Sequence, residues 1–413
     1  MNEIELTSQP IEATGKTTVF LWDSFAICFL SNIAAGIIST VMPVYLPEAV
    51  QTLSGPVTQG QMASISAFIS ALYMLGWAIG GLLWGFIGDK AGRSRSLMLS
   101  FASLGLFTCL ISYSPRWEFV VALRFLSGFS VGGILVLTPT LLSEVWPVKS
   151  RSIVIGITSI GFPIGIFSSG LITYLVTDWR QAFLVGFLPL SLAFISIWFL
   201  PESEKWKLAN GSNIDRGIAV SKTDRHNLLT GSIIFSSMLI GLWGMFSWIP
   251  MWVQSLVDIG GQTERGIAMM LLGGGGLAGG FFSGWLSNSL GARKAMLFCF
   301  AGCLLMSVLL FGLHRSFSVV IYAELSLLSL FFGISQGLLS IYIPQLFPVG
   351  IRGRATGFCF NIGRFATAGA VFFVGVLVTA LGGYGNTLLT FAGIFIAGFL
   401  AVYNTKNQTI TQS

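Results

Sequence analysis

Two stretches of the sequence repeat one pattern: GGLLWGFIGDKAGRSR at residues 80–95 and GGFFSGWLSNSLGARK at residues 279–294. Each stretch begins inside a long apolar segment, contains several glycines and ends in a short basic loop. Each also lies at the end of the second long apolar segment in its half of the chain. The repeat therefore predicts that the 413 residues form two similar halves.

A second pair of stretches supports the same division: LLSEVWPVKSRSIVIG at residues 141–156 and IYIPQLFPVGIRGRATG at residues 341–357. Their alignment matches Pro147 with Pro348, Arg151 with Arg352 and Gly156 with Gly357. Two similar halves in a membrane protein indicate a pseudo-twofold axis along the membrane normal, with a cavity at their interface that opens alternately to each side. This architecture is typical of transporters.

The composition is that of a membrane protein, because 54% of the residues are hydrophobic and only 9% are charged, against about 25% in an ordinary soluble domain. Twelve apolar segments are near or above the ~20 residues that a helix needs to cross a bilayer. They are residues 19–46, 62–87, 96–113, 117–141, 153–176, 180–200, 228–257, 265–287, 293–313, 317–342, 355–380 and 385–405. They lack the alternation of barrel strands, so we predict an all-α membrane protein with twelve transmembrane helices in two pseudo-symmetric six-helix halves.

The only long polar stretch inside the chain separates the sixth and seventh segments. We therefore predict a cytoplasmic tail at residues 1–18, a six-helix bundle at 19–200, a cytoplasmic linker at 201–227, a second bundle at 228–405 and a cytoplasmic tail at 406–413. The polar, acidic first residues do not fit a cleavable signal peptide.

The basic residues predict the orientation. With both termini in the cytoplasm, the cytoplasmic tails and loops hold sixteen of the 22 basic residues and the outer loops hold four. Because cytoplasmic loops carry an excess of Lys and Arg, we expect this topology. The net charge of +6 is then a topology signal and gives no indication of nucleic-acid binding.

Short motifs resemble those of one family. GFIGDKAGRSR resembles the G-x-x-x-D-x-x-G-R-x-R loop of the major facilitator superfamily, and ALRFLSGFSVGG, SEVWPVKSR and LPESEKW resemble motifs of its sugar-porter and organic-ion branches. The resemblance covers essentially the whole chain. It implies alternating access, a multi-pass protein of a cell membrane (with such short tails, a bacterial inner membrane) and a fold that works as a monomer.

In the superfamily this loop latches the cytoplasmic side shut in the outward-open state. The resemblance carries that role to Gly85, Asp89, Gly92, Arg93 and Arg95, with Glu144 and Arg151 as network partners. Physically, Asp89 can accept hydrogen bonds from an arginine and from a helix N-terminus. The alternative is that these residues only set the topology. The second-half copy has Asn288 and Gln345 at the acidic positions, so its network is expected to be weaker.

Three residues are candidates for proton coupling. The resemblance suggests Arg124, whose alternative role is an ion pair with Glu118. The repeat places Glu324 opposite Leu123, and a carboxyl in low dielectric there could load and release a proton; alternatively it lies near the outer headgroups. Asp23 sits about one turn inside the first segment, where an interfacial role competes with coupling.

Arg364 in NIGRF lies near the middle of the eleventh segment, where a cation costs about 2.5–3.5 kcal/mol on insertion scales. Asn361 shares its helix face at i, i+3 spacing. A guanidinium can hold a carboxylate bidentately, and an arginine in this helix resembles the organic-anion and aromatic-acid branches. The hypothesis is a positive site for an anionic substrate. The alternative is a buried arginine satisfied by backbone carbonyls or by Glu324.

Other side chains could line the cavity, although an aromatic stripe often serves packing alone. They are Trp243, Phe246, Tyr73, Trp77, Asn32, Gln336 and Tyr342.

These features favour a secondary transporter that imports a small organic anion, such as a carboxylate, together with protons. A neutral-sugar porter or a drug or metabolite efflux carrier with a structural Arg364 is the alternative, and a non-transporting sensor on a carrier fold is a third possibility. No phosphate loop of the form G-x-x-x-x-G-K-[ST] is present, which disfavours an ATP-driven pump. The sequence contains no catalytic triad or metal cluster, so we expect neither an enzyme nor a cofactor or metal site.

Overall fold

The computed structural model describes residues 15–204, 206, 222–257, 260–348 and 351–405. Within these ranges all regular structure is helical and there is no strand. Twelve crossings among the described residues are long and apolar enough to span a membrane. The predicted fold class is therefore confirmed, and helices are the expected solution because every backbone polar group in a bilayer must be satisfied internally.

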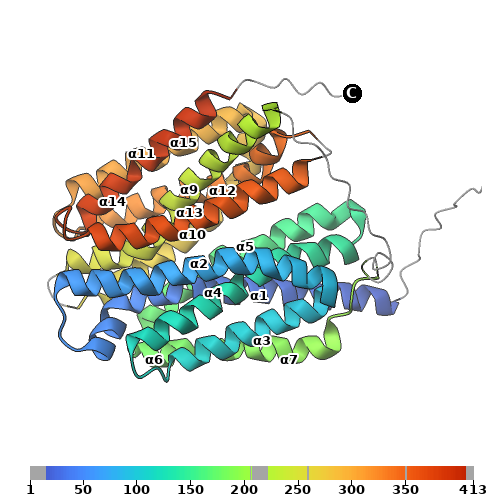
Figure 1. The fold of residues 1–413 in the computed structure, drawn as a ribbon, viewed down its shortest axis with the longest axis horizontal. Helices are drawn as coiled ribbons and strands as arrows, with labels where there is room; N and C mark the ends of the chain where they lie inside the picture. Colours follow the sequence, from blue (N-terminus) through green and yellow to red (C-terminus); the bar gives the residue numbers. More distant parts are fainter. Residues whose placement is uncertain (1–14, 205, 207–221, 258–259, 349–350, 406–413) are drawn as a thin grey trace, which may run out of the picture.

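The helices form two bundles that lie side by side (Figure 1). The first contains α1 (Gly15–Ser54), α2 (Gln59–Ala91), α3 (Arg93–Ile111), α4 (Trp117–Val145), α5 (Val148–Leu175), α6 (Trp179–Ala182), η1 (Phe183–Gly186) and α7 (Phe187–Phe199). The second contains α9 (Lys222–Ser255), α10 (Gln262–Leu290), α11 (Ala292–Leu313), α12 (Val320–Gln345), α13 (Arg352–Leu377), α14 (Tyr384–Ala392) and α15 (Ile394–Tyr403). The last crossing of each bundle is thus broken into consecutive helices.

The two bundles repeat the same helix pairings. In the first bundle α2 packs on α4 and α1 on α5, and in the second α10 packs on α12 and α9 on α13. The bundles meet where α5 packs on α10 and where α2 packs on α13. α5 and α13 are the fifth crossings of their bundles, and α2 and α10 are the second. Each contact therefore joins a fifth crossing to a second crossing, and the interface has the pseudo-twofold symmetry that the sequence repeat predicted.

The repeated arginines play the same structural part in both halves. The Nε atom of Arg151 donates to the Trp146 carbonyl oxygen at 3.2 Å, and that of Arg352 donates to the Phe347 carbonyl oxygen at 3.3 Å. Each arginine thereby satisfies a carbonyl left open where the preceding helix ends. The equivalent prolines force that ending, because proline cannot continue the hydrogen-bond ladder.

Glycines bring α2 and α4 into backbone contact. Any Cβ atom added at these positions would overlap a carbonyl group of the other helix: Gly76 faces Phe125, Gly80 faces Phe129, Gly128 faces Tyr73 and Gly132 faces Trp77. Small residues at such crossings let membrane helices associate by van der Waals packing. This contact fixes α2, which forms one wall of the interface between the bundles.

Successive helices run in opposite directions, so the connections fall at two ends. The α2–α3 and α10–α11 connections, with Lys90, Arg93, Arg293 and Lys294, lie at one end, here called the basic end (right in Figure 1). The α1–α2 and α9–α10 connections lie at the other, here called the clamp end.

The glycine contact is testable by adding one methyl group. Gly76→Ala should lower the free energy of unfolding by about 1–3 kcal/mol, because overpacking forces backbone shifts. Thermal unfolding of the detergent-purified protein measures the loss. Gly156→Ala is the control, since a Cβ on Gly156 would meet no atom within 4 Å. Equal melting temperatures for the two variants would contradict the close approach of α2 and α4.

Candidate functional site

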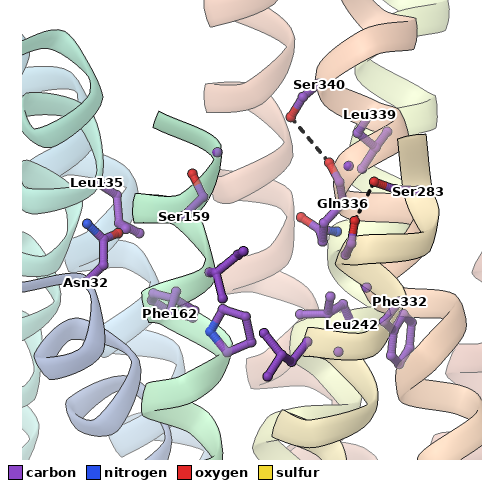
Figure 2. Close-up of a pocket in the computed structure, with 18 of the residues that line it drawn as sticks. Asn32, Leu135, Ser159, Phe162, Leu242, Ser283, Phe332, Gln336, Leu339 and Ser340 are labelled. Atoms are coloured by element: carbon purple, nitrogen blue, oxygen red, sulfur yellow. Dashed lines mark hydrogen bonds between the residues drawn. The ribbon is translucent and has the colours of Figure 1, made fainter. Parts of the chain in front are cut away.

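A cavity of about 1130 Å³ lies between the two bundles. Its inner part is lined by residues near the middle of the helices, among them Asn32, Trp77 and Trp243. From there it extends along α5 to Ser152 and along α10 to Gly284, so that it opens at the basic end. Figure 2 shows Asn32 of α1 and Gln336 of α12 on opposite walls.

Aromatic rings from both bundles form the inner part of the cavity. Trp77 of α2 meets Trp243 of α9 edge-to-face, with ring centroids 4.9 Å apart. Phe162 of α5 lies 5.9 Å from Trp77 and 6.1 Å from Trp243. Phe246 continues the wall toward Phe332 of α12 at 6.0 Å. Trp77, Trp243 and Phe246 were candidates from sequence, whereas Phe162 and Phe332 were not.

Arg364 of α13 is the only charged residue among the described residues that line this cavity. Its Nη1 atom donates to Oδ1 of Asn361 at 3.3 Å. The guanidinium lies against α2 of the other bundle, because a Cβ on Gly81 would be only 3.0 Å from Nη1. No ion pair involving Arg364 occurs within the described ranges, and Glu324 is paired elsewhere.

The remaining predicted substrate residues divide into two groups. Asn32 and Gln336 line the cavity, whereas Asn361, Tyr73 and Tyr342 do not. Asn361 acts on the cavity through Arg364. Tyr342 forms a hydrogen bond with Thr405 at 2.6 Å near the basic end.

Arg124 is 1% exposed and lies behind the cavity wall. Its guanidinium carbon lies 3.7 Å from the ring centroid of Tyr73, and its Nη1 atom donates to the Ile38 carbonyl oxygen at 2.8 Å. No carboxylate of the described chain forms an ion pair with it, including Glu118. Tyr73 in turn meets Trp77 at a centroid distance of 6.2 Å, so the buried cation supports the aromatic wall indirectly.

The acidic candidates for proton coupling lie away from the cavity. Glu324 is one turn into α12 at the clamp end, where its Oε2 atom is 2.9 Å from Nε2 of His314. Both side chains are 16% exposed. Asp23 lies in α1 toward the basic end and does not line the cavity.

The loop at residues 89–95 forms a network within the first bundle. Arg93 pairs with Asp89 at 2.7 Å and with Glu144 at 3.1 Å. Glu202, in the segment after α7, accepts from the backbone N–H groups of Arg93 at 2.7 Å and Ser94 at 3.1 Å. The carboxylate thus caps the N-terminus of α3, where the macrodipole favours an anion.

The other residues of the predicted latch have separate places. Gly92 has a φ of +105° and packs against the Glu202 carboxylate. Gly85 lines a small pocket beside Asp89 and Arg93, and Arg95 is exposed. Arg151 bonds the Trp146 carbonyl oxygen and takes no part in the network. Glu202 was not singled out from sequence as a network member.

The clamp end is closed by contacts between the bundles. Arg265 of α10 is fully buried and pairs with Glu48 of α1. Its Nη1 atom also donates to Oε1 of Gln254 of α9 at 2.7 Å. We call Glu48, Gln254, Gln262 and Arg265 the clamp. Among the described ion pairs, Glu48–Arg265 alone joins the two bundles.

Gln262 completes the clamp at the end of α5. Its Nε2 atom donates to the carbonyl oxygens of Thr173 and Val176, each at 2.8 Å. On the other side of the interface, Phe68 of α2 packs edge-to-face on Phe372 of α13 at 5.1 Å. The cavity is therefore open at the basic end and closed at the clamp end. The clamp was not predicted from the sequence, because residue spacing does not reveal which bundle faces supply the partners of Arg265.

Comparison with known proteins identifies the family. Residues 24–371 match the sequence profile of the Major Facilitator Superfamily. The chain belongs to the major facilitator superfamily. It is accordingly a multi-pass membrane transporter and not an enzyme, and the resemblance inferred from its motifs is confirmed.

Two curated relatives cover most of the chain. It is 25% identical to the cis,cis-muconate transport protein of Acinetobacter baylyi, over 83% of this chain and 86% of the relative. It is 26% identical to the 4-hydroxybenzoate transporter PcaK of the same organism, over 89% and 86%. The solved D-xylose-proton symporter is similar in fold, with a TM-score of 0.78, 16% identity and coverage of 93% of this chain and 97% of that one.

The protein should open at the clamp end when Glu48 loses its charge. Glu48→Gln leaves Arg265 as an unpaired buried cation, which costs about 3–5 kcal/mol and favours any state that exposes it to water. Spin labels at the exposed positions Gln51 and Thr263 report the separation of α1 and α10. The distance between the labels should increase.

Arg315→Gln is the matched control for this measurement. Arg315 bonds Asn386 at 3.2 Å within the second bundle, on the exposed surface of the clamp end. Its loss should leave the distance between the labels unchanged. An unchanged distance in Glu48→Gln would mean that the clamp does not hold this end closed.

Proposed function

We propose that this transporter imports a small organic carboxylate together with protons by alternating access. The observation that carries the proposal is that Arg364 is the only charged residue lining the cavity among the described residues. A single cation in a low-dielectric site attracts an anion and gives a neutral substrate no such advantage.

The geometry of Arg364 suits a carboxylate. A guanidinium presents parallel donors to both carboxylate oxygens. Nη1 of Arg364 donates one hydrogen bond to Asn361, and this bond is near the upper limit of hydrogen-bond distance. The other N–H groups of the guanidinium are available to a ligand. The cavity that it lines is otherwise largely apolar and includes the rings of Trp77, Phe162 and Trp243. Such a site accommodates an anion with a planar or unsaturated body, and the relatives named for cis,cis-muconate and 4-hydroxybenzoate support that class.

The orientation follows from the basic loops. We place the basic end in the cytoplasm by the positive-inside rule, with both termini there and the protein in a bacterial inner membrane. The structure then corresponds to an inward-open state, in which the carboxylate leaves toward the cytoplasm. The bundles at 19–200 and 228–405, joined by the linker at 201–227, are proposed to move as two units of a monomer. Much of that linker and the tails at 1–14 and 406–413 lie outside the described residues.

The closing of the basic end is assigned to the loop at residues 89–95. Within the described residues, the ion pairs of Asp89, Arg93 and Glu144 all lie in the first bundle, and the Asp89 side chain is 67% exposed. This leaves Asp89 available to engage the second bundle when the cavity closes. Gly85, Gly92 and Arg95 shape the loop, while Arg151 anchors the end of α4.

The proton site is proposed at Glu324, beside His314. The Oε2 atom of Glu324 lies 2.9 Å from Nε2 of His314, so the two side chains can hold a proton between them. Arg124 and Asp23 remain secondary candidates, since neither forms an ion pair within the described residues, whereas Glu324 is paired with His314.

Arg364 is tested by ligand-induced thermal stabilisation of the purified protein. 4-Hydroxybenzoate, benzoate and cis,cis-muconate should raise the melting temperature, because ligands that bind the folded state stabilise it. Arg364→Ala should weaken carboxylate binding about 10–150-fold, the equivalent of the ~1.5–3 kcal/mol of a charge-assisted hydrogen bond.

Two glycine variants separate the position of the guanidinium from its charge. Gly81→Ala keeps Arg364 but crowds Nη1, so it should weaken the same ligands less than Arg364→Ala does. Gly369→Ala adds a methyl group elsewhere on α13, outside the cavity lining and where no atom lies within 4 Å, and should bind as wild type. Stabilisation by neutral sugars or lipophilic cations alone, unaffected by Arg364→Ala, would instead favour a sugar porter or efflux carrier.

Proton coupling is tested by uptake into proteoliposomes. A one-unit pH gradient, acidic outside, should support about tenfold accumulation of the carboxylate per coupled proton, and a protonophore should abolish it. Glu324→Gln should lose accumulation but keep binding, whereas Glu118→Gln, an exposed acid at the same end, should keep both. Accumulation that persists in Glu324→Gln would move the proton site elsewhere.

A further inference from the structure

Most polar side chains that line the cavity are already hydrogen-bonded within their own helices. Six hydroxyl groups donate to a backbone carbonyl oxygen three or four residues earlier, those of Thr138, Thr158, Ser159, Ser283, Ser340 and Thr367. The side-chain nitrogen of Asn32 likewise donates to the Cys28 carbonyl oxygen at 2.9 Å. The donors of these side chains therefore already serve the helices that carry them.

Two donors in the cavity lining differ, because they are buried and have no hydrogen-bond partner among the described residues. They are Nε1 of Trp77 on α2 and Nε2 of Gln336 on α12. A buried donor without a partner destabilises the folded state and needs an explanation. In a cavity wall, a bound ligand can supply the missing acceptor.

The two donors lie on different sides of the cavity. Trp77 is one turn before Gly81 on α2, and the guanidinium of Arg364 packs against Gly81. Trp77 therefore belongs to the side where the carboxylate is expected to bind. Gln336 is on α12, which packs on α10, and α10 meets the first bundle at the other contact, with α5. Gln336 is thus the buried donor that lies away from Arg364.

The cavity has room beside Gln336. α10 packs closely on α12 here, because a Cβ atom on Gly337 would overlap the Ser283 side chain. Near this contact α10 adds only backbone to the cavity wall, at Gly280. The Ser340 hydroxyl group donates to the backbone carbonyl oxygen of Gln336 at 3.3 Å, not to its side chain (Figure 2). The side-chain nitrogen of Gln336 is therefore available to a ligand.

The charge of the cavity favours a neutral partner for Gln336. Arg364 is the only charged residue among the described residues that line the cavity. A monocarboxylate bound to it makes the site neutral, whereas a dicarboxylate leaves one negative charge among neutral groups. An unpaired charge in such a site is unfavourable. A hydroxyl or carbonyl oxygen accepts the same hydrogen bond without this cost.

We propose that Gln336 forms a second subsite, which donates a hydrogen bond to a neutral oxygen atom at the far end of the substrate. The protein then selects monocarboxylates that carry a hydroxyl or carbonyl group over unsubstituted monocarboxylates and over dicarboxylates. This proposal rests on the proposed function, because it takes Arg364 as the carboxylate site. Arg364 binds the charge that all carboxylates share, and Gln336 distinguishes between them.

A set of ligands that differ at one position tests the substrate class. Benzoate, 4-hydroxybenzoate, 4-carbamoylbenzoate and terephthalate carry a hydrogen, a hydroxyl, a neutral amide and a second carboxylate at the para position. Isothermal titration calorimetry of the purified protein at neutral pH gives their dissociation constants. 4-Hydroxybenzoate and 4-carbamoylbenzoate should bind about 3–10-fold more tightly than benzoate, as one neutral hydrogen bond allows. Terephthalate should bind at least about tenfold more weakly than 4-carbamoylbenzoate, which matches its shape without the second charge.

Failure of this inference and failure of the proposed function give different results. Equal dissociation constants for benzoate and the two neutral para-substituted ligands overturn the second subsite. Terephthalate that binds as tightly as 4-carbamoylbenzoate overturns the preference for a neutral oxygen. In both cases, carboxylate binding that is lost in Arg364→Ala retains the proposed function. Absence of binding of all four ligands to folded protein overturns the proposed function and the second subsite with it.

A substitution at Gln336 tests the residue. Gln336→Leu removes the amide and keeps a side chain of similar size. The ratio of the dissociation constant of benzoate to that of 4-hydroxybenzoate should fall toward one. Benzoate itself should bind as tightly as before or more tightly, because a buried donor without a partner has been removed. A merely structural role of Gln336 would weaken both ligands together and leave their ratio unchanged.

Gln345→Leu provides a matched control on the same helix. Gln345 is exposed and does not line the cavity. Its ratio of dissociation constants should equal that of wild type. A folded Gln336→Leu variant that keeps the wild-type ratio overturns the assignment to Gln336. If that variant does not fold, the order of the four ligands on the wild-type protein still decides whether the second subsite exists.

Discussion

The cost of placing a charge in hydrocarbon governs where this chain keeps its ionisable groups. Only 9% of its residues are charged, and most of those in the described helices lie at or near a helix end. Each one that enters the bundles has an identifiable environment. Arg265 has Glu48, Arg124 has an aromatic face and a backbone carbonyl, and Arg364 has an open cavity. Each environment belongs to a different part of the molecule. Arg265 joins the two bundles, Arg124 supports the aromatic wall from behind, and Arg364 lines the cavity.

The two ends of the interface use different chemistry although the fold repeats. At the clamp end an ion pair and two hydrogen bonds to carbonyl oxygens of α5 join the bundles. At the basic end the charges of the loop at residues 89–95 are satisfied within the first bundle. The second-half copy has Asn288 and Gln345 in place of the acids, so no carboxylate stands at these two positions. The ion pairs at the two ends of the described structure therefore differ: one joins the bundles at the clamp end, and the others lie within the first bundle at the basic end.

The sequence predicted the fold because its signals are local or repeated. Twelve apolar segments and two repeated loops determine the crossings and the pseudo-twofold, and each can be read without knowing the packing. Arg364 was also predictable, since a lone arginine in an apolar segment is conspicuous. The clamp was not, because Glu48 and Arg265 lie far apart in sequence near the ends of their helices, where charges are ordinary. The rings of Phe162 and Phe332 were missed for a related reason: in a chain with 35 phenylalanines, only packing distinguishes a cavity wall from a lipid-facing surface.

The glycines of α10 have a consequence for how the range of substrates could change. Gly275 and Gly279 face the backbone of α12, whereas Gly276, Gly280 and Gly284, at intervals of four residues, line the cavity. Part of the α10 wall of the cavity is therefore backbone without side chains, which enlarges the cavity there. Replacing a wall glycine by a larger residue would narrow the cavity without touching the guanidinium of Arg364. The size of the cavity and its charge are thus set on different helices, α10 and α13, and can evolve independently.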